Sequence, residues 1–295
     1  MKAVLLRETG GPEQLSVEEV EEPPEPSLRV RAAGVNFLDV LVRRGQYPQM
    51  PELPHVLGSE VAGELEGRRV LGFPSGSGGG YAERVSVDPQ WTFELPDGAG
   101  FEEGAAFLLA YLTAWLPLRR LEGGAVLVTA ASGGVGSAAI QVAKHLGAHV
   151  IAAASTDEKR RFALEIGADE SVGYDDLPAC DVAFDPVGGD VLTACLAALR
   201  PLGTVIAIGS AGGTWQDVNP ALLVGRNVSL QGFYLGRLMR LAPDLVRVAA
   251  EEVLDLWRKR AVRPVVGATF PLEQAADAHR LIDDRKHLGK LVLTV

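Results

Sequence analysis

The chain of 295 residues lacks the features that mark several common classes of protein. It has only two cysteines, Cys180 and Cys195, which are too few for a disulfide framework or a structural zinc site. No basic run offsets the net charge of −10, which argues against a nucleic-acid surface. No apolar run reaches the roughly 18 residues that would span a membrane, and the N-terminus turns polar at Arg7, too early for a signal peptide. We therefore expect a soluble, cytoplasmic protein.

Motifs of other catalytic classes are missing as well. The only Gly-Lys pair, Gly289-Lys290, is followed by Leu291, so there is no Walker A loop. No tyrosine has a lysine four residues later, as a short-chain dehydrogenase would, and no GxSxG stands at a strand–helix turn. The five histidines are scattered and form no zinc-ligand pattern, so we expect no metal site.

The first hundred residues have the composition of a mostly β domain. Proline and glycine recur in stretches such as GGPEQL, EEPPEPS and GFPSGSGGGYAE, and short alternating segments such as Leu28–Arg31 and Arg69–Phe73 lie between them. Short strands interrupted by turn residues are typical of β-rich structure.

From about Phe101 the pattern changes to helix-length segments that alternate with continuous apolar runs. Gly147 and Gly167 are expected to end the first two helices of this pattern, and Arg200–Gly203 to form a turn. The tail Val262–Val295 is expected to form a strand, a helix and a strand. This alternation predicts a parallel sheet covered on both faces. The expected strands are 125–128, 149–154, 181–185 and 204–209.

The stretch VTAASGGVGS, residues 128–137, joins the first of these strands to a helix. A strand, a glycine turn and a helix in this order form a dinucleotide-binding loop, in which bare N–H groups approach a pyrophosphate. The GxGxxG positions are Ala131, Gly133 and Gly136, so alanine replaces the first glycine. The alternative is a glycine turn that only packs a helix on a strand. The residues expected to contact the cofactor here are Ser132, Gly133, Gly134, Val135 and Gly136.

The end of the next strand favours NADPH over NADH. An NAD site carries a carboxylate there for the ribose 2′-OH, whereas this strand ends Ala153-Ala154-Ser155-Thr156. Ser155, Lys159 and Tyr174 offer a hydroxyl, an ammonium and a phenol, which can hold a 2′-phosphate. The alternative for Lys159 is a solvated helix lysine.

Stretches spread over the whole chain resemble one known family, the zinc-independent quinone oxidoreductases (zeta-crystallin type) of the medium-chain dehydrogenase/reductase superfamily. The resemblance implies an α/β fold in which a doubly wound Rossmann sheet is inserted into a GroES-like β-rich domain. It places the GroES-like substrate domain at 1–110 plus 262–295 and the NADPH-binding Rossmann domain at 111–261. The matching stretches are MKAVLLRETGGPEQL, Gly34–Asp39, Gly45–Pro48, Leu57–Glu60, Leu112–Ala114, AASGGVGSAAIQVAK, Phe184–Gly189, Gln231–Phe233 and FPLEQAADAHRLIDDRKHLGKLVL.

The resemblance also implies site residues. Asn36 is expected to orient the nicotinamide or the substrate carbonyl, and Tyr47, Ser59 and Thr113 to act as neutral donors or proton sources. Gly209 and Phe233 complete the expected cofactor contacts. Tyr81 is expected to pack a strand. The strand near Val228–Leu230, together with the family, suggests an edge-to-edge homodimer.

The chain departs from its relatives in three places. Zinc-dependent members have Cys and His where this chain has Asn36 and Ser59, Leu41 stands where a tyrosine is frequent, and the segment between Glu64 and Tyr81 is short. The interpretation is an NADPH-dependent enzyme that reduces quinones without a metal. The alternatives are an NADPH-dependent alkenal or enone reductase and a nucleotide-binding protein with little catalysis.

Overall fold

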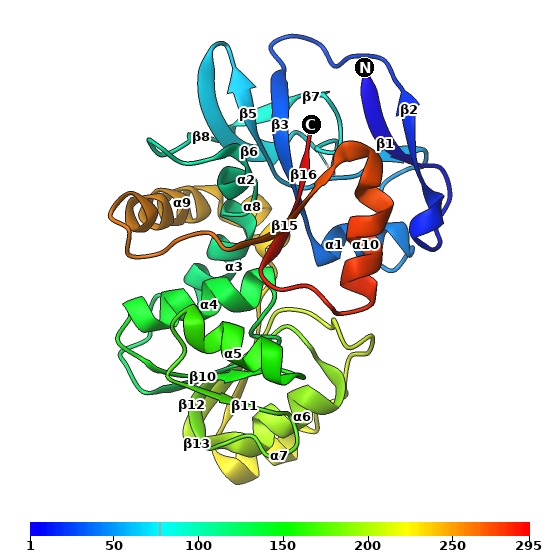
Figure 1. Ribbon diagram of the computed structural model, residues 1–295. Helices are drawn as coiled ribbons and strands as arrows, with labels where there is room; N and C mark the ends of the chain where they lie inside the picture. Colours follow the sequence, from blue (N-terminus) through cyan, green and yellow to red (C-terminus); the bar gives the residue numbers. More distant parts are fainter. Residues whose placement is uncertain (77) are drawn as a thin grey trace. The chain divides into compact units, whose positions relative to one another are not determined.

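The computed structural model describes residues 1–76 and 78–295, which divide into two compact units. The first unit comprises Met1–Leu109 and Pro264–Val295, and the second comprises Ala110–Arg263 (Figure 1). The second unit is thus inserted in the sequence between the two segments of the first. The assignment of substrate binding to one unit and NADPH binding to the other stays a prediction.

The larger sheet of the first unit has seven strands in the order β15-β16-β3-β5-β6-β8, with β7 paired to β3. These pairings are antiparallel except that of β15 with β16. Because Leu291 pairs with Val35, the start of β16 lies beside the end of β3, although the two are far apart in the sequence. The strands are β3 (Leu28–Val35), β5 (Val61–Leu65), β6 (Arg68–Pro74), β7 (Arg84–Val85), β8 (Val87–Glu94), β15 (Val266–Pro271) and β16 (Lys290–Thr294).

A smaller antiparallel sheet, in the order β2-β1-β4, completes the β-structure of this unit. Helix α10 packs on the core through Ala275, Ala278 and Ile282, whose spacing places them on one face. The remaining elements of the unit are β1 (Lys2–Leu6), β2 (Leu15–Glu19), β4 (His55–Val56), α1 (Phe37–Arg43), α2 (Phe101–Ala105), α10 (Ala275–Asp283) and the 3₁₀ turns at Pro12–Gln14 and Leu272–Gln274.

The short segment after Glu64 begins with a tight hairpin. Leu65 of β5 pairs with Arg68 of β6, so only Glu66 and Gly67 form the loop. Their φ angles are 49° and 77°, as a two-residue type I′ turn requires, and glycine adopts such angles without strain. This two-residue loop keeps β5 and β6 adjacent in the sheet.

The second unit contains a six-stranded parallel sheet in the order β11-β10-β9-β12-β13-β14. Numbered within the unit, this is the order 3-2-1-4-5-6 of a doubly wound Rossmann sheet, whose direction reverses between β9 and β12. The predicted α/β fold class is confirmed. The strands are β9 (Ala125–Val128), β10 (His149–Ala153), β11 (Glu170–Val172), β12 (Cys180–Asp185), β13 (Leu199–Ala207) and β14 (Ser229–Gly232).

Helices follow most strands of this sheet, as the sequence pattern indicates. Helix α9 is the most clearly amphipathic, with Val246, Val253 and Trp257 on its buried face. The helices are α3 (Leu108–Leu118), whose first two residues belong to the first unit, α4 (Gly134–His145), α5 (Asp157–Glu165), α6 (Gly189–Ala198), α7 (Pro220–Arg226), α8 (Leu235–Leu241) and α9 (Pro243–Arg258).

Two local predictions have different outcomes. Gly147 and Gly167 follow α4 and α5 with φ angles of 79° and 116°, so the expected glycine stops are confirmed. The turn expected at Arg200–Gly203 is wrong, because these residues belong to β13. The strand accommodates them with an irregular register opposite β12 and with Leu202 at a φ of 68°.

The helices differ from membrane spans in length and apolarity. In the part of the chain that the structure describes, no helix combines enough length with enough apolar character to cross a bilayer. Both cysteines are reduced and buried in the second unit, where they pack in its apolar core.

Candidate active site

Asn36 stands at the junction between β3 and α1, where the chain leaves the sheet and begins a helix. Asparagine is favoured at such N-cap positions because its side chain can accept hydrogen bonds from the first helical N–H groups. Here the Asn36 N–H donates to Asp39 Oδ2 at 2.9 Å, while the Asn36 carboxamide contacts residues of other elements. Asn36 therefore both begins the helix and connects it to other parts of the unit through its side chain.

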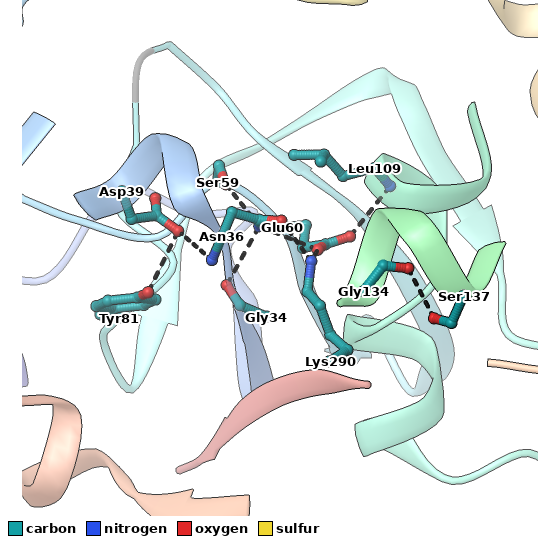
Figure 2. Close-up of polar contacts among 10 residues, drawn as sticks. All are labelled: Gly34, Asn36, Asp39, Ser59, Glu60, Tyr81, Leu109, Gly134, Ser137 and Lys290. Carbon is teal, nitrogen blue, oxygen red and sulfur yellow. Dashed lines mark hydrogen bonds and ion pairs between the residues drawn. The ribbon is translucent and has the colours of Figure 1, made fainter. Parts of the chain in front are cut away.

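The Asn36 carboxamide belongs to a polar cluster with Ser59, Glu60 and Lys290 (Figure 2). Asn36 Nδ2 lies 3.0 Å from Ser59 Oγ and 3.0 Å from Glu60 Oε1. Lys290 Nζ donates to both Asn36 Oδ1 and Glu60 Oε1. Asn36, Glu60 and Lys290 are buried, whereas Ser59 is half-buried. Ser59 is thus the member of this cluster that reaches the surface of the unit.

The ion pair at the base of this cluster is almost completely removed from water. The side chains of Glu60 and Lys290 are 2% and 5% exposed, and Glu60 Oε2 also accepts from Leu109 N at 3.1 Å. An isolated charge at this depth would be costly, so each partner compensates the other. Gly34 leaves room for the pair, because a Cβ there would lie 2.6 Å from Glu60 Oε1 and 2.2 Å from Ala105 O.

A second series of buried polar contacts connects Asp39 in α1 with His279 in α10. Tyr81 OH donates to Asp39 Oδ2 at 3.2 Å and lies 3.3 Å from His279 Nε2. Burial raises the pKa of the Asp39 carboxyl to about 7 and lowers the pKa of His279 to about 3. The sequence predicts only that Tyr81 packs a strand; it is indeed fully buried, and its hydroxyl links two titratable groups.

The four predicted catalytic residues occupy different parts of the fold. Asn36 and Ser59 meet in the cluster described above. Tyr47 follows α1, is half-buried, and packs against the apolar core of the first unit. Thr113 is a half-buried residue of α3 in the second unit. Their roles in catalysis stay predictions.

The predicted phosphate loop runs from β9 into α4, at the point where the strand order reverses. Gly133 is the N-cap of α4, and the first N–H groups of a helix have no carbonyl partner one turn earlier. A Cβ at Gly136 would lie 2.3 Å from Ala130 O, so this glycine is needed for close packing of helix and strand. Ser137 Oγ donates to Gly134 O at 2.9 Å (Figure 2). Ser132 is buried, whereas Val135 is half-buried.

Asp185 organises the neighbouring strand end. Thr129 Oγ1 donates to Asp185 Oδ1 at 2.6 Å, which joins the ends of β9 and β12. The N–H groups of Val187 and Gly188 also donate to this fully buried carboxylate, at 2.9 and 3.1 Å. The crevice at a strand-order reversal is where doubly wound sheets bind ligands. Asp185 stabilises that edge of the sheet, although the sequence analysis predicted no role for this residue.

The tip of β10 carries the residues predicted to hold a 2′-phosphate. Ser155 is exposed, and Lys159 is half-buried in the first turn of α5. The Tyr174 hydroxyl accepts from Ala130 N at 2.9 Å and also lies 3.3 Å from Ala153 O, so it already ties the ends of β9 and β10 together. The phosphate-binding roles of these residues stay predictions.

The structure adds a cation that the sequence pattern had not singled out. Arg160 Nη1 donates to Ala154 O at 3.2 Å, at the end of β10, and Arg160 also pairs with Asp157. Arg160 directly follows Lys159, so the two adjacent basic residues in the first turn of α5 could have indicated this second cation from the sequence. Asp157, the first carboxylate after β10, is thereby paired with a cation.

Gly209 and Phe233 follow the carboxyl ends of β13 and β14. Phe233 N donates to Ala207 O at 2.9 Å, and a Cβ at Gly209 would lie 3.3 Å from Pro186 O. Phe233 lines an open, mostly apolar surface hollow of about 430 Å³. The other lining residues are Ala207, Trp215, Gly232, Tyr234, Arg237, Leu238 and Leu241.

The potential metal ligands of the chain are dispersed over the fold. Among residues 1–76 and 78–295, no three His, Cys, Asp or Glu side chains are arranged to hold a metal ion.

Comparisons with known proteins agree with the two-unit fold. Residues 22–97 match the family described as alcohol dehydrogenase GroES-like domain, and residues 134–251 match the family described as zinc-binding dehydrogenase. The first match identifies the β-rich unit as GroES-like, as the resemblance implied.

Individual relatives extend over the whole chain. Quinone oxidoreductase-like protein 2 of Bos taurus is 33% identical over 326 residues, covering 100% of this chain and 92% of the relative. Quinone oxidoreductase of Pseudomonas aeruginosa is 34% identical over 327 residues, covering 99% of each. The structure of the quinone oxidoreductase from Thermus thermophilus, which was also determined with NADPH, superimposes with a TM-score of 0.88 at 36% identity over 100% of both chains. The chain belongs to the zinc-independent quinone oxidoreductase family of the medium-chain dehydrogenase/reductase superfamily.

Proposed function

We propose that this protein is an NADPH-dependent oxidoreductase that reduces quinones. The observation that carries the proposal is the β9–α4 turn at the reversal of the Rossmann sheet, in a chain similar throughout its length to quinone oxidoreductases. Family membership supports the reaction type, and the site residues support the choice of cofactor.

The residues of the second unit fit a dinucleotide. At the β9–α4 turn the helix N-terminus presents N–H groups, and the contact of Gly136 with Ala130 O keeps the helix close to the strand. At the tip of β10, Lys159 and Arg160 provide cations, and Asp157 is paired with Arg160. Cations at this point favour the 2′-phosphate of NADPH, because Arg and Lys form strong charge-assisted hydrogen bonds with phosphate.

A bound NADPH supplies the reducing equivalents for the acceptor. This chain's own residues then have to position the acceptor and relieve the negative charge that develops on its oxygen. Asn36, Tyr47, Ser59 and Thr113 are uncharged hydrogen-bonding residues that serve this task, either by contact with the acceptor or by orienting a residue that contacts it. One such donor typically contributes ~3 kcal/mol to the stabilisation of the transition state.

Steady-state kinetics test this function. The protein is assayed with NADPH and with NADH, using 1,2-naphthoquinone in one series and a 2-alkenal in another. We expect turnover of the quinone with NADPH and a higher kcat/KM for the quinone than for the alkenal. A higher kcat/KM for the alkenal would instead favour an enone reductase. Binding of NADPH without turnover of either acceptor would favour a nucleotide-binding protein.

We further propose that two copies associate through the exposed edge of β14, since this strand ends the Rossmann sheet. Leu202 and Val224, which are 85% and 78% exposed, supply apolar surface, and Leu202 N donates to Asn227 O two residues before β14. Light scattering after size-exclusion chromatography should show a dimer that Val224→Glu shifts to monomer. Val248→Glu on α9, where the valine is 56% exposed, serves as the matched control. A monomeric native chain would contradict this proposal.

A further inference from the structure

The hydrogen-bond inventory of the Asn36 carboxamide fixes which way it faces. An asparagine side chain has two N–H donors on Nδ2 and an accepting oxygen, whereas a lysine ammonium can only donate. The atom of Asn36 that Lys290 Nζ contacts must therefore be Oδ1. The two hydrogens of Nδ2 are then directed to Ser59 Oγ and Glu60 Oε1, each 3.0 Å away. Both hydrogens of Nδ2 are thus used inside the first unit, where Gly34 O also lies 3.5 Å from Nδ2, and Oδ1 accepts from Lys290.

The same inventory decides the role of the neighbouring serine. Ser59 Oγ accepts a hydrogen from Asn36 Nδ2, so the hydroxyl hydrogen of Ser59 has to point elsewhere. Among the described residues, Ser59 Oγ has no other hydrogen-bond partner, and the side chain is half-buried. A hydroxyl that accepts one charge-supported hydrogen bond is also a better donor, because chains of hydrogen bonds polarise one another.

We propose that Ser59 is the residue of this cluster that donates to the acceptor's carbonyl oxygen, and that Asn36, Glu60 and Lys290 are positioning residues that act through it. The inference rests on the proposed function, since it names the group that contacts the substrate of that reaction. It assigns to Asn36 an indirect role in place of the direct contact expected from the sequence. The ligand that we expect is a neutral conjugated carbonyl compound. The Ser59 hydroxyl can donate a hydrogen bond to its oxygen, but it carries no charge that could neutralise an anionic ligand.

The buried ion pair explains how this arrangement is maintained. Glu60 directly precedes β5 and Lys290 begins β16, and neither side chain can reach water without leaving its partner. Glu60 Oε2 is fixed in turn by Leu109 N at 3.1 Å. Figure 2 shows the resulting order from Lys290 through Asn36 to Ser59. A donor held in place before the reaction loses no free energy to reorientation during it.

A double-mutant cycle tests the inference, with kcat/KM for 1,2-naphthoquinone as the readout. Ser59→Ala should lower kcat/KM about 100-fold, the scale of losing one preorganised donor, while Ser59→Thr keeps the hydroxyl and should stay within about threefold of the native protein. Asn36→Ala should lower kcat/KM less than Ser59→Ala, and the double variant should equal Ser59→Ala alone. Multiplying losses in the double variant would show that Asn36 acts independently of Ser59 and would overturn the proposal.

Two further readouts separate positioning from folding. Lys290→Met should lower kcat more than it raises KM, and Lys290→Arg, which still donates, should recover most of kcat. Arg43→Met is the matched control, because Arg43 is a buried cation of the same unit that pairs with Asp283. It should lower the Tm but keep kcat well below that temperature. Should Lys290→Met fail to fold, Lys290→Arg and the cycle above still decide the question.

A measurement without cofactor completes the test. Quenching of tryptophan fluorescence by a naphthalenediol reports binding of a product-like ring, and Ser59→Ala should weaken this binding about tenfold while Ser59→Thr preserves it. Equal binding and equal kcat/KM in Ser59→Ala and the native protein would overturn the role of Ser59. Failure of the native protein to reduce any quinone would instead refute the proposed function.

Discussion

The candidate sites of the two units are built from different parts of the chain. In the second unit, the β9–α4 turn offers backbone N–H groups, and its decisive residue, Gly136, contributes by having no side chain. In the first unit, the cluster around Asn36 consists of side chains from segments far apart, and its charged members are buried. A phosphate can be bound by local backbone, whereas a substrate oxygen needs a donor placed by tertiary packing.

This difference predicts unequal tolerance to substitution. The candidate site at the β9–α4 turn depends on close packing of helix and strand at Gly136, so a substitution that adds atoms there should weaken it. The cluster around Asn36 depends on the buried ion pair of Glu60 and Lys290, so a substitution that removes one of these charges should weaken it. Four sets of variants test this contrast, and the effect that we expect decreases from the first set to the last when the pH-dependent third set is taken per pH unit.

The greatest change is expected for Lys290→Met. It leaves Glu60 buried without its counter-charge, which should lower the free energy of unfolding by about 3–5 kcal/mol. The double variant Lys290→Met/Glu60→Leu should regain most of this loss, because no charge is then buried alone. Urea denaturation measures both. Lys144→Met removes a half-exposed lysine paired with Asp169 and should cost about 1 kcal/mol or less. Equal losses for the two lysines would show that burial of the first pair is unimportant.

Gly136→Ala should have the next greatest effect. Its Cβ would lie 2.3 Å from Ala130 O and 2.9 Å from Ala131 Cα, both backbone atoms, so α4 must shift. We expect a loss of about 1–3 kcal/mol in stability and a marked loss of NADPH affinity, measured by fluorescence titration. Gly225→Ala in α7, where a Cβ meets no atom within 4 Å, is the control and should be neutral or stabilising. Unchanged NADPH binding by Gly136→Ala would place the cofactor elsewhere.

A third prediction concerns Asp39 and His279, which both contact the hydroxyl of Tyr81. The pKa of Asp39 is raised from 3.8 to about 7 by burial, so between these values the folded state binds the extra proton and stability falls as pH rises. The pKa of His279 is lowered from 6.5 to about 3 by burial, so between these values the unfolded state binds the extra proton and stability rises with pH. The two slopes oppose each other over the shared range.

Single variants should reveal each slope. The stability of Asp39→Asn relative to the native protein should increase from pH 4 to pH 7, and that of His279→Gln should decrease from pH 3 to pH 6, each by up to about 1.4 kcal/mol per pH unit. Thermal unfolding across this pH range gives both curves. Parallel curves for a variant and the native protein would mean that the replaced group titrates as it does in water.

The weakest effect is expected at the tip of β10. Lys159→Ala should weaken NADPH binding about tenfold and leave NADH binding unchanged, since only NADPH carries the 2′-phosphate. Lys144→Ala, elsewhere on the second unit, is the matched control and should affect neither cofactor. If Lys159→Ala weakens neither cofactor selectively, the phosphate pocket has been assigned to the wrong residues.

The second unit could be predicted well because its signals are local. A strand, a glycine turn and a helix occupy a few consecutive residues, and glycine ends such as Gly147 and Gly167 reflect backbone angles that few other residues adopt. The prediction of a turn at Arg200–Gly203, which was based on the proline and the glycine there, was wrong. These residues lie within β13 as an irregular stretch, between Leu199 and Thr204, which both pair with β12.

Less of the first unit's site could be predicted. Asn36 and Ser59 were identified only through resemblance to a family, and no pattern in the chain connected them with Lys290 or Tyr81. The contact between Asn36 and Lys290 depends on β16 pairing with β3, and the contact between Tyr81 and His279 on α10 packing against the core. Neither follows from residue spacing.

The order of residues along the chain was enough to predict a β-rich region followed by a parallel α/β sheet with a glycine turn after its first strand, because periodicity, glycine positions and strand ends are local properties. That the sheet is inserted into the β-rich domain was implied by the family resemblance. Tertiary packing was needed to establish which side chains meet around Asn36, and the role that we propose for Ser59 depends on that arrangement. A buried charge is stable only beside a partner of opposite charge, and the partner of Glu60 is Lys290, which lies near the other end of the chain.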